Sequence, residues 1–220
     1  MARHDHGPLL HAGWLAAALF ALALLVMGAA TPGYVHADAA ISNLGAAGAP
    51  HARWWNLLGF VVPGLLVALF AYALAMAMRD EGIGAAGRIG LWLLCFSGLA
   101  FAGNGIWPYD LARPFERASQ LHVAMLTLAM VAYLPAAVLV AVGLRGRNDW
   151  RALVAVGPVL ALLTLASIAD RAGNFIPMLE GTPGYGQRIT LALYFGWMVL
   201  ASWVALRRPR GGRPPTALGR

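Results

Sequence analysis

Long runs of apolar residues, separated by short polar segments, dominate the sequence. Six runs are about 20 residues long, which is the length that a helix needs to cross the hydrocarbon core of a bilayer. Apolar and polar positions do not alternate along these runs, as they would in a membrane β-barrel. The pattern predicts an all-α integral membrane protein with six transmembrane helices in one compact bundle, at about residues 9–30, 55–78, 88–107, 121–144, 152–170 and 189–207.

The first apolar run has a competing interpretation as a secretory signal peptide. Arg3 precedes it, and the small residues 28–30 end it. It is longer than the apolar part of a typical signal peptide, which is about 7–15 residues. We therefore expect a retained helix, so that residues 1–208 form a single membrane domain and residues 209–220 form a basic disordered tail.

The composition supports a membrane protein and excludes other classes. The chain is 60% hydrophobic and 11% charged, whereas soluble domains are about 45–50% apolar and about 25% charged. The single cysteine, Cys95, excludes a disulfide scaffold. The net charge of +7 does not indicate nucleic-acid binding, because the arginines fall between apolar runs and form no single patch.

The distribution of the 16 arginines predicts the orientation. Eleven fall on the side that holds both termini, and five fall on the opposite side. Positively charged residues are enriched in cytoplasmic segments. We therefore expect cytoplasmic N- and C-termini and place the long segments around residues 31–54, 104–120 and 170–188 on the external side.

These external segments hold the candidate catalytic residues Asp38, Asp110 and His122. Ionisable groups near a membrane interior are costly unless they are paired, so they are functional candidates. A carboxylate beside an imidazole can orient the ring for general-base catalysis on water. A competing interpretation is structural, in which Asp38 or Asp110 pairs with Arg188 and joins the external loops.

Two further kinds of catalysis have weaker support in the sequence. Ser42 as a nucleophile would need a neighbouring base such as His122, and Ser42 is also expected to cap a short helix at about 39–46. The external histidines and acids lack the regular spacing of a metal site on a helix. We therefore predict no metal and no cofactor.

A polar and aromatic pocket is the other interpretation of the external side. Arg188 would pair with a phosphate in such a pocket, although aromatic residues also gather at the interfaces of membrane proteins in general. The candidate ligand-binding residues are Tyr34, Ser42, Asn43, Asn56, Trp107, Gln187 and Arg188.

Several short motifs along the chain form a recognisable set: Tyr34, Ile41–Gly45, Pro50, Asn56, Gly59–Phe60, Gly64–Leu66, Trp107–Pro108, Asp110, His122, Gly184–Arg188 and Trp197. With these motifs the sequence resembles a bacterial and archaeal membrane family known as domain of unknown function 998. The resemblance covers about residues 9–207 and implies a six-helix fold in a prokaryotic inner or plasma membrane, without an established activity. One departure is Trp107, where the family typically has Phe in a Gly-x-Phe-Pro segment.

Two functional hypotheses follow from the sequence. The first is a membrane protein whose external pocket binds or handles a lipid or another amphiphile. The alternative is a membrane-embedded hydrolase or transferase that uses the external Asp and His residues. Membrane lipids are the expected partners and nucleic acid is not, while a protein partner and the oligomeric state stay open.

Overall fold

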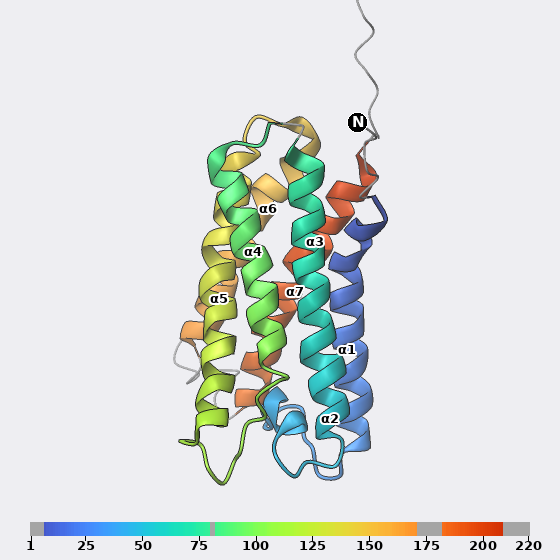
Figure 1. Ribbon diagram of the computed structural model, residues 1–220, viewed down its shortest axis with the longest axis vertical. Coiled ribbons are helices and arrows are strands. Elements are labelled where there is room, and N and C mark those ends of the chain that lie inside the picture. Colours follow the sequence, from blue (N-terminus) through green and yellow to red (C-terminus); the bar gives the residue numbers. More distant parts are fainter. Residues whose placement is uncertain (1–6, 80–81, 171–181, 209–220) are drawn as a thin grey trace, which may run out of the picture.

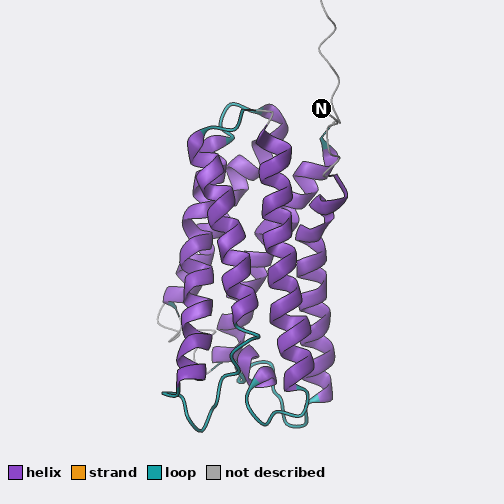
Figure 2. Cartoon of the chain, viewed as in Figure 1, coloured by secondary structure: helices purple, strands orange, loops and turns teal. Residues whose placement is uncertain are grey.

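The computed structural model describes residues 7–79, 82–170 and 182–208, and these ranges contain helices and loops but no strand (Figures 1 and 2). Six helical segments in them are long and apolar enough to cross a membrane, which confirms the predicted fold class. The long helices are α1 (Ala12–Ala30), α3 (Val62–Arg79), α4 (Ala85–Gly103), α5 (Arg117–Gly143), α6 (Arg151–Ala169) and α7 (Pro183–Arg207). The short helices are η1 (Gly7–His11), η2 (Ile41–Gly45), α2 (Ala52–Trp55), the π-helical η3 (Asn56–Val61) and η4 (Asn148–Trp150).

The long helices pack in sequence order, and α7 packs against both α6 and α1, which closes the bundle. One hydrogen bond at this closure joins the Ser202 hydroxyl on α7 to the Leu10 carbonyl at 2.5 Å. Large apolar side chains such as Leu25, Val131 and Leu162 lie exposed on the outer surface. Such a surface is stable in lipid, where apolar side chains need no cover from water.

Small residues allow a close helix contact between α3 and α4. A Cβ atom added at Gly98 would lie 2.6 Å from the backbone nitrogen of Ala68 and 2.7 Å from the carbonyl oxygen of Gly64. Only glycine permits this backbone separation. Close approach through small residues is a main source of helix association in membranes, where the hydrophobic effect contributes little.

Aromatic side chains fill the centre of the bundle and bring α7 against α4 and α5. The rings of Phe101 and Tyr194 stack with centroids 5.6 Å apart, and Tyr133 meets Tyr194 edge to face at 4.9 Å. The Ser97 hydroxyl donates to the Ala129 carbonyl at 2.8 Å, which links α4 to α5. The interior is therefore filled by rings and small residues at this level.

The two ends of the bundle differ. Both ends of the described chain lie at one end, here called the terminal end, and η2 lies at the other, the loop end (Figure 1). At the loop end, the Ala47 N–H donates to the Tyr109 carbonyl at 2.9 Å, so the first two predicted external segments meet. Residues 171–181 and the predicted tail at 209–220 lie outside the described residues. A cytoplasmic location of the terminal end stays a prediction.

Two helix boundaries differ from the sequence prediction in ways that affect the candidate site. The last helix begins at Pro183 instead of about 189, so Gln187 and Arg188 lie in its first turns. Proline is favoured at the start of a helix because its missing N–H has no intrahelical partner there. The α4 helix ends at Gly103 instead of about 107, and the carbonyls of Asn104 and Trp107 turn toward His122.

Candidate functional site

Arg188 on α7 holds the segment that follows α1. Its guanidinium donates to the Tyr34 hydroxyl at 2.5 Å, to His36 Nδ1 at 3.1 and 3.2 Å, and to the Ala39 carbonyl at 3.1 Å. A fifth bond reaches the Gly184 carbonyl within α7 at 2.7 Å. We call this set of contacts the Arg188 clamp. It leaves Arg188 engaged by protein acceptors and joins residues that are about 150 positions apart.

The first turn of α7 supports the same segment at two more points. The Gln187 side-chain oxygen accepts from the Ile41 N–H at 2.8 Å, and the Tyr185 N–H donates to the Ala37 carbonyl at 3.2 Å. A Cβ added at Gly184 would lie 2.5 Å from the carbonyl oxygens of His36 and Ala37. The sequence Gly-Tyr-Gly-Gln-Arg therefore combines a close backbone approach with two anchoring side chains.

Both aromatic side chains of the clamp, Tyr34 and His36, have shifted pKa values. Burial raises the pKa of the Tyr34 hydroxyl, although the positive charge and hydrogen bond of Arg188 act in the opposite direction. Burial and the Arg188 charge both lower the pKa of His36. His36 Nδ1 accepts from Arg188, so the clamp requires the neutral imidazole.

His122 lies buried in the second turn of α5 and is held by backbone carbonyls. Its Nδ1 lies 3.1 Å from the Asn104 carbonyl oxygen and 3.0 Å from that of Trp107. Because both partners are acceptors, Nδ1 carries the proton, and in the neutral imidazole Nε2 is an acceptor. Phe60 packs edge to face on the ring at 5.8 Å, and Tyr109 lies at 5.9 Å.

Asn104 fixes the turn that supplies those carbonyls. Its side chain is fully buried against α5. With the amide oriented so that both atoms are satisfied, its nitrogen donates to the His122 carbonyl at 3.1 Å and its oxygen accepts from the Leu126 N–H at 3.2 Å. Asn104 and His122 therefore hold each other through reciprocal side-chain and backbone bonds.

A cavity of about 160 Å³ lies beside His122 at the loop end. It is bounded by η2, η3, α5, α6 and α7 and combines a mostly apolar wall with a few uncharged polar groups. Three of the predicted site residues, Ser42, His122 and Gln187, line it. The other lining residues are Ile41, Phe60, Leu126, Met130, Ile168, Gly186, Thr190 and Leu191.

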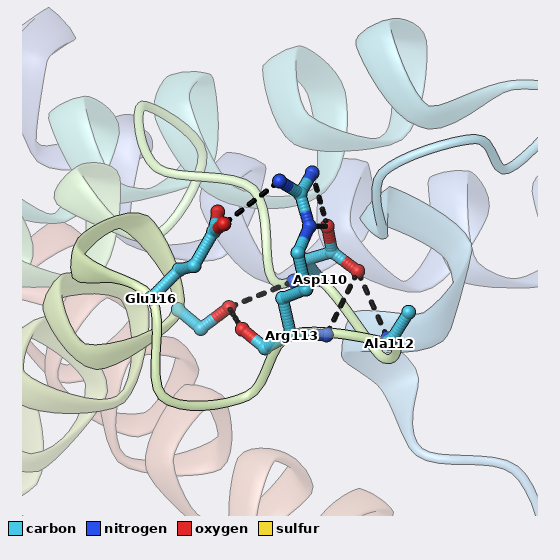
Figure 3. A network of polar contacts seen from close by, with 5 residues as sticks. Asp110, Ala112, Arg113 and Glu116 are labelled. Carbon is cyan, nitrogen blue, oxygen red and sulfur yellow. Dashed lines mark hydrogen bonds and ion pairs between the residues drawn. The ribbon is translucent and has the colours of Figure 1, made fainter.

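Asp110 lies in the loop between α4 and α5, where it organises its own turn (Figure 3). Its carboxylate accepts from the Ala112 N–H at 2.9 Å and pairs with the Arg113 guanidinium at 2.9 Å. Arg113 also pairs with Glu116 at 2.7 Å, and the Ser119 hydroxyl accepts from the Asp110 N–H at 3.0 Å. Burial acts to raise the pKa of Asp110, but the Ala112 N–H and the Arg113 contacts outweigh it and hold that pKa below its usual range.

The structure does not unite the three predicted catalytic residues. No hydrogen bond among the described residues links Asp110 or Asp38 to His122, and Asp38 is exposed. The expected ion pair with Arg188 does not form either, because the ion pairs of Asp110 go to Arg113 and Arg188 bonds to neutral acceptors. Within the described ranges, no group of three His, Cys, Asp or Glu side chains is arranged to hold a metal ion.

The remaining predicted ligand-binding residues, Asn43, Asn56 and Trp107, do not line the cavity. The Asn56 amide donates to the Gly45 carbonyl at 3.0 Å and connects η3 to η2. Trp107 contributes its backbone carbonyl to His122 and is half-buried. Asn43 lies half-buried inside η2. The short helix expected near 39–46 is present, but it begins at Ile41 and no side chain caps it.

Sequence reasoning missed the residues that line most of the cavity. His122, Leu126 and Met130 are spaced four residues apart, so they lie on one face of α5. Gly186, Gln187, Thr190 and Leu191 form a similar stripe on α7. Extending the helical period from His122 and Gln187 would have identified both walls. The bond between His36 and Arg188 has no signal in the sequence, because the two residues are 152 positions apart.

Comparison with known proteins identifies a family but no activity. A family model described as "Protein of unknown function (DUF998)" matches residues 14–206. No curated protein and no solved structure matches the chain.

Proposed function

Because this chain belongs to the family of unknown function DUF998, its role rests on its own residues, and we propose that it binds an uncharged amphiphile in the loop-end cavity. The observation that carries the proposal is the combination of an apolar wall with uncharged polar groups in that cavity. The site is part of a polytopic membrane protein, so the surrounding lipid is a source of amphiphilic ligands.

The apolar wall suits a hydrocarbon body. Phe60, Leu126, Met130, Ile168 and Leu191 come from four different elements and surround the same volume. Pockets of this kind bury the apolar part of a ligand, while a few polar groups fix its orientation. Burial of hydrocarbon against other side chains gives affinity within lipid chiefly through packing, which favours a ligand whose shape fits the cavity.

The polar groups suit a hydroxyl or amide at the other end of the ligand. His122 Nδ1 is occupied by two carbonyls, which leaves Nε2 to accept a hydrogen bond in the neutral ring. The Ser42 hydroxyl can donate or accept, and the Gln187 amide nitrogen can donate while its oxygen holds Ile41.

The charges near the cavity favour an uncharged ligand over a phosphate. Among the described residues that line it, none is Asp, Glu, Lys or Arg. The sequence suggested that Arg188 would bind a phosphate, but its guanidinium makes its hydrogen bonds to Tyr34, His36 and backbone carbonyls. An anion inside the cavity would therefore lose hydration without gaining an opposite charge, which is costly.

A pair of glycine substitutions on α7 tests the proposal. A Cβ at Gly186 or at Gly196 would meet no atom within 4 Å, but only Gly186 lines the cavity. We expect Gly186→Leu to reduce photocrosslinking of a diazirine monoacylglycerol by about tenfold or more, because a side chain of this size occupies ligand space. Gly196→Leu is the control and should label like wild type. Equal labelling of all three proteins would refute the site.

Charged probes separate the ligand classes. A diazirine fatty acid and a diazirine lysophosphatidic acid carry the same chain with an anionic end. We expect weaker labelling by both than by the monoacylglycerol, with crosslinks from the neutral probe mapping to α5 and α7. Preferential labelling by either anionic probe would overturn the assignment of an uncharged ligand.

A second candidate, hydrolysis or acyl transfer, is favoured by one observation: Ser42 and His122 line the same cavity. His122 Nε2 would take the Ser42 proton while Ser42 Oγ attacks an ester carbonyl, and the protonated ring would return that proton to the leaving alcohol. No hydrogen bond joins the two side chains in the described structure, so η2 would have to move. Fluorophosphonate labelling that Ser42→Ala abolishes is the expected result for an enzyme, and an unlabelled wild-type protein excludes this serine mechanism.

A further inference from the structure

A second cavity lies at the terminal end of the bundle, between the start of α6 and the end of α7. Its volume is about 350 Å³. It is far along both helices from the loop-end cavity and shares no residue with it. The lining residues are Asn148, Asp149, Arg151, Ala152, Trp203, Val204, Arg207 and Arg208.

The cavity carries excess positive charge. Three of its side chains are arginines and one is acidic, and the Arg208 Nε donates to the Asp149 carboxylate at 2.6 Å. Arg151 and Arg207 have no ion-pair partner among the described residues. Two arginine charges therefore border the cavity without a compensating carboxylate in the part of the chain that the structure describes.

Tryptophan rings orient two of the arginines. The Arg207 guanidinium lies 4.2 Å from the centre of the Trp203 ring, and that of Arg208 lies 4.7 Å from the Trp150 ring. A guanidinium stacked on an aromatic face keeps the N–H donors around its edge available. Arginine donors in this arrangement suit the oxygen atoms of a phosphate.

The cavity also lies at the membrane boundary. The apolar span that η4 and α6 form begins at Asn148, and that of α7 ends at Arg207. Lipid phosphates occupy this level of a bilayer. Trp203 is 45% exposed beside the cavity, so its ring is available to the lipid below the phosphate.

We propose that this terminal-end cavity binds a phosphate-type anion, supplied by the headgroup of an anionic phospholipid. Arg151 and Arg207 contact the phosphate oxygens, and Arg208, neutralised by Asp149, shapes the wall. The proposal is independent of the ligand at the loop end, because the two cavities have no residue in common.

Two matched double variants of the full chain test this site. Arg151→Gln with Arg207→Gln removes two charges from the cavity. Arg79→Gln with Arg88→Gln removes two charges from the same end of the bundle, at the connection between α3 and α4, outside the cavity. Native mass spectrometry of the delipidated protein then measures binding of phosphatidylglycerol and phosphatidylcholine.

We expect the cavity variant to bind phosphatidylglycerol about tenfold or more weakly than wild type, because it lacks two arginine charges that attract the anionic headgroup. The control should stay within about twofold, and phosphatidylcholine binding should not change. Equal losses in both variants would overturn the site in favour of general surface charge.

Inorganic phosphate distinguishes the two sources of the anion. We expect millimolar phosphate to leave phosphatidylglycerol binding to wild type almost unchanged, because the free ion lacks the lipid part that contacts Trp203. Displacement of the lipid by phosphate at equal concentration would overturn the assignment to a lipid headgroup.

Discussion

Arg188→Lys should loosen the segment between α1 and η2 while keeping the positive charge. Three groups of that segment, the Tyr34 hydroxyl, His36 Nδ1 and the Ala39 carbonyl, accept from the guanidinium. A lysine ammonium is a single point donor and cannot span them. If the ammonium keeps a hydrogen bond to one of these three groups, the bonds to the other two groups are lost.

The magnitude follows from those two bonds. Hydrogen bonds to charged groups contribute about 1.5–3 kcal/mol each, and partial exposure of Arg188 favours the lower value. The loss is then about 3 kcal/mol, which raises the fraction of molecules with the segment open on the order of 100-fold.

A cysteine at position 41 reports that opening. Ile41 is 2% exposed and its N–H is held by Gln187. In a Cys95→Ala background, maleimide labelling of Ile41→Cys in detergent measures the open fraction when closing is faster than labelling. We expect labelling on the order of 100-fold faster with Arg188→Lys. The control is Arg53→Lys, which changes an exposed arginine in cation–π contact with Trp54 at the same end of the bundle. If Arg188→Lys changed the labelling rate of Ile41→Cys by no more than about twofold, the clamp would be refuted.

Three further predictions concern pH, packing and the Asp110 turn. Because the pKa of His36 is lowered in the folded protein, the unfolded chain binds a proton at this residue more readily. The melting temperature should therefore fall as the pH drops below about 6.5, and the fall should be smaller in His36→Gln. Identical pH profiles of the two proteins would contradict this. Gly98→Ala should lower the free energy of unfolding, measured with denaturant, by about 1–3 kcal/mol, because the new Cβ would lie 2.6 Å from the Ala68 nitrogen. Gly196→Ala places its Cβ in open space and should not destabilise the protein. Equal effects of the two substitutions would argue against the close contact. Asp110→Asn should speed proteolysis of its loop without changing crosslinking in the cavity, and lost crosslinking would give Asp110 a role at the ligand site.

The local sequence pattern determined the number and approximate limits of the membrane-spanning helices. Long apolar runs satisfy their backbone hydrogen bonds internally and have few alternatives in a bilayer, so hydropathy alone predicts them. The same pattern indicated that the segments around residues 31–54 and 104–120 share one end of the bundle, since the direction of the chain reverses with each span.

Tertiary structure decided which of the candidate side chains act together. Asp110 lies close in sequence to His122, yet its carboxylate pairs with Arg113, three residues away, because a short loop satisfies that charge locally. Arg188 instead meets Tyr34, and Gln187 meets Ile41, across about 150 positions. Such contacts depend on how α7 packs beside α1 and on where its first turn begins. Hydropathy carries no information on helix rotation or neighbour order, and these two properties create both cavities.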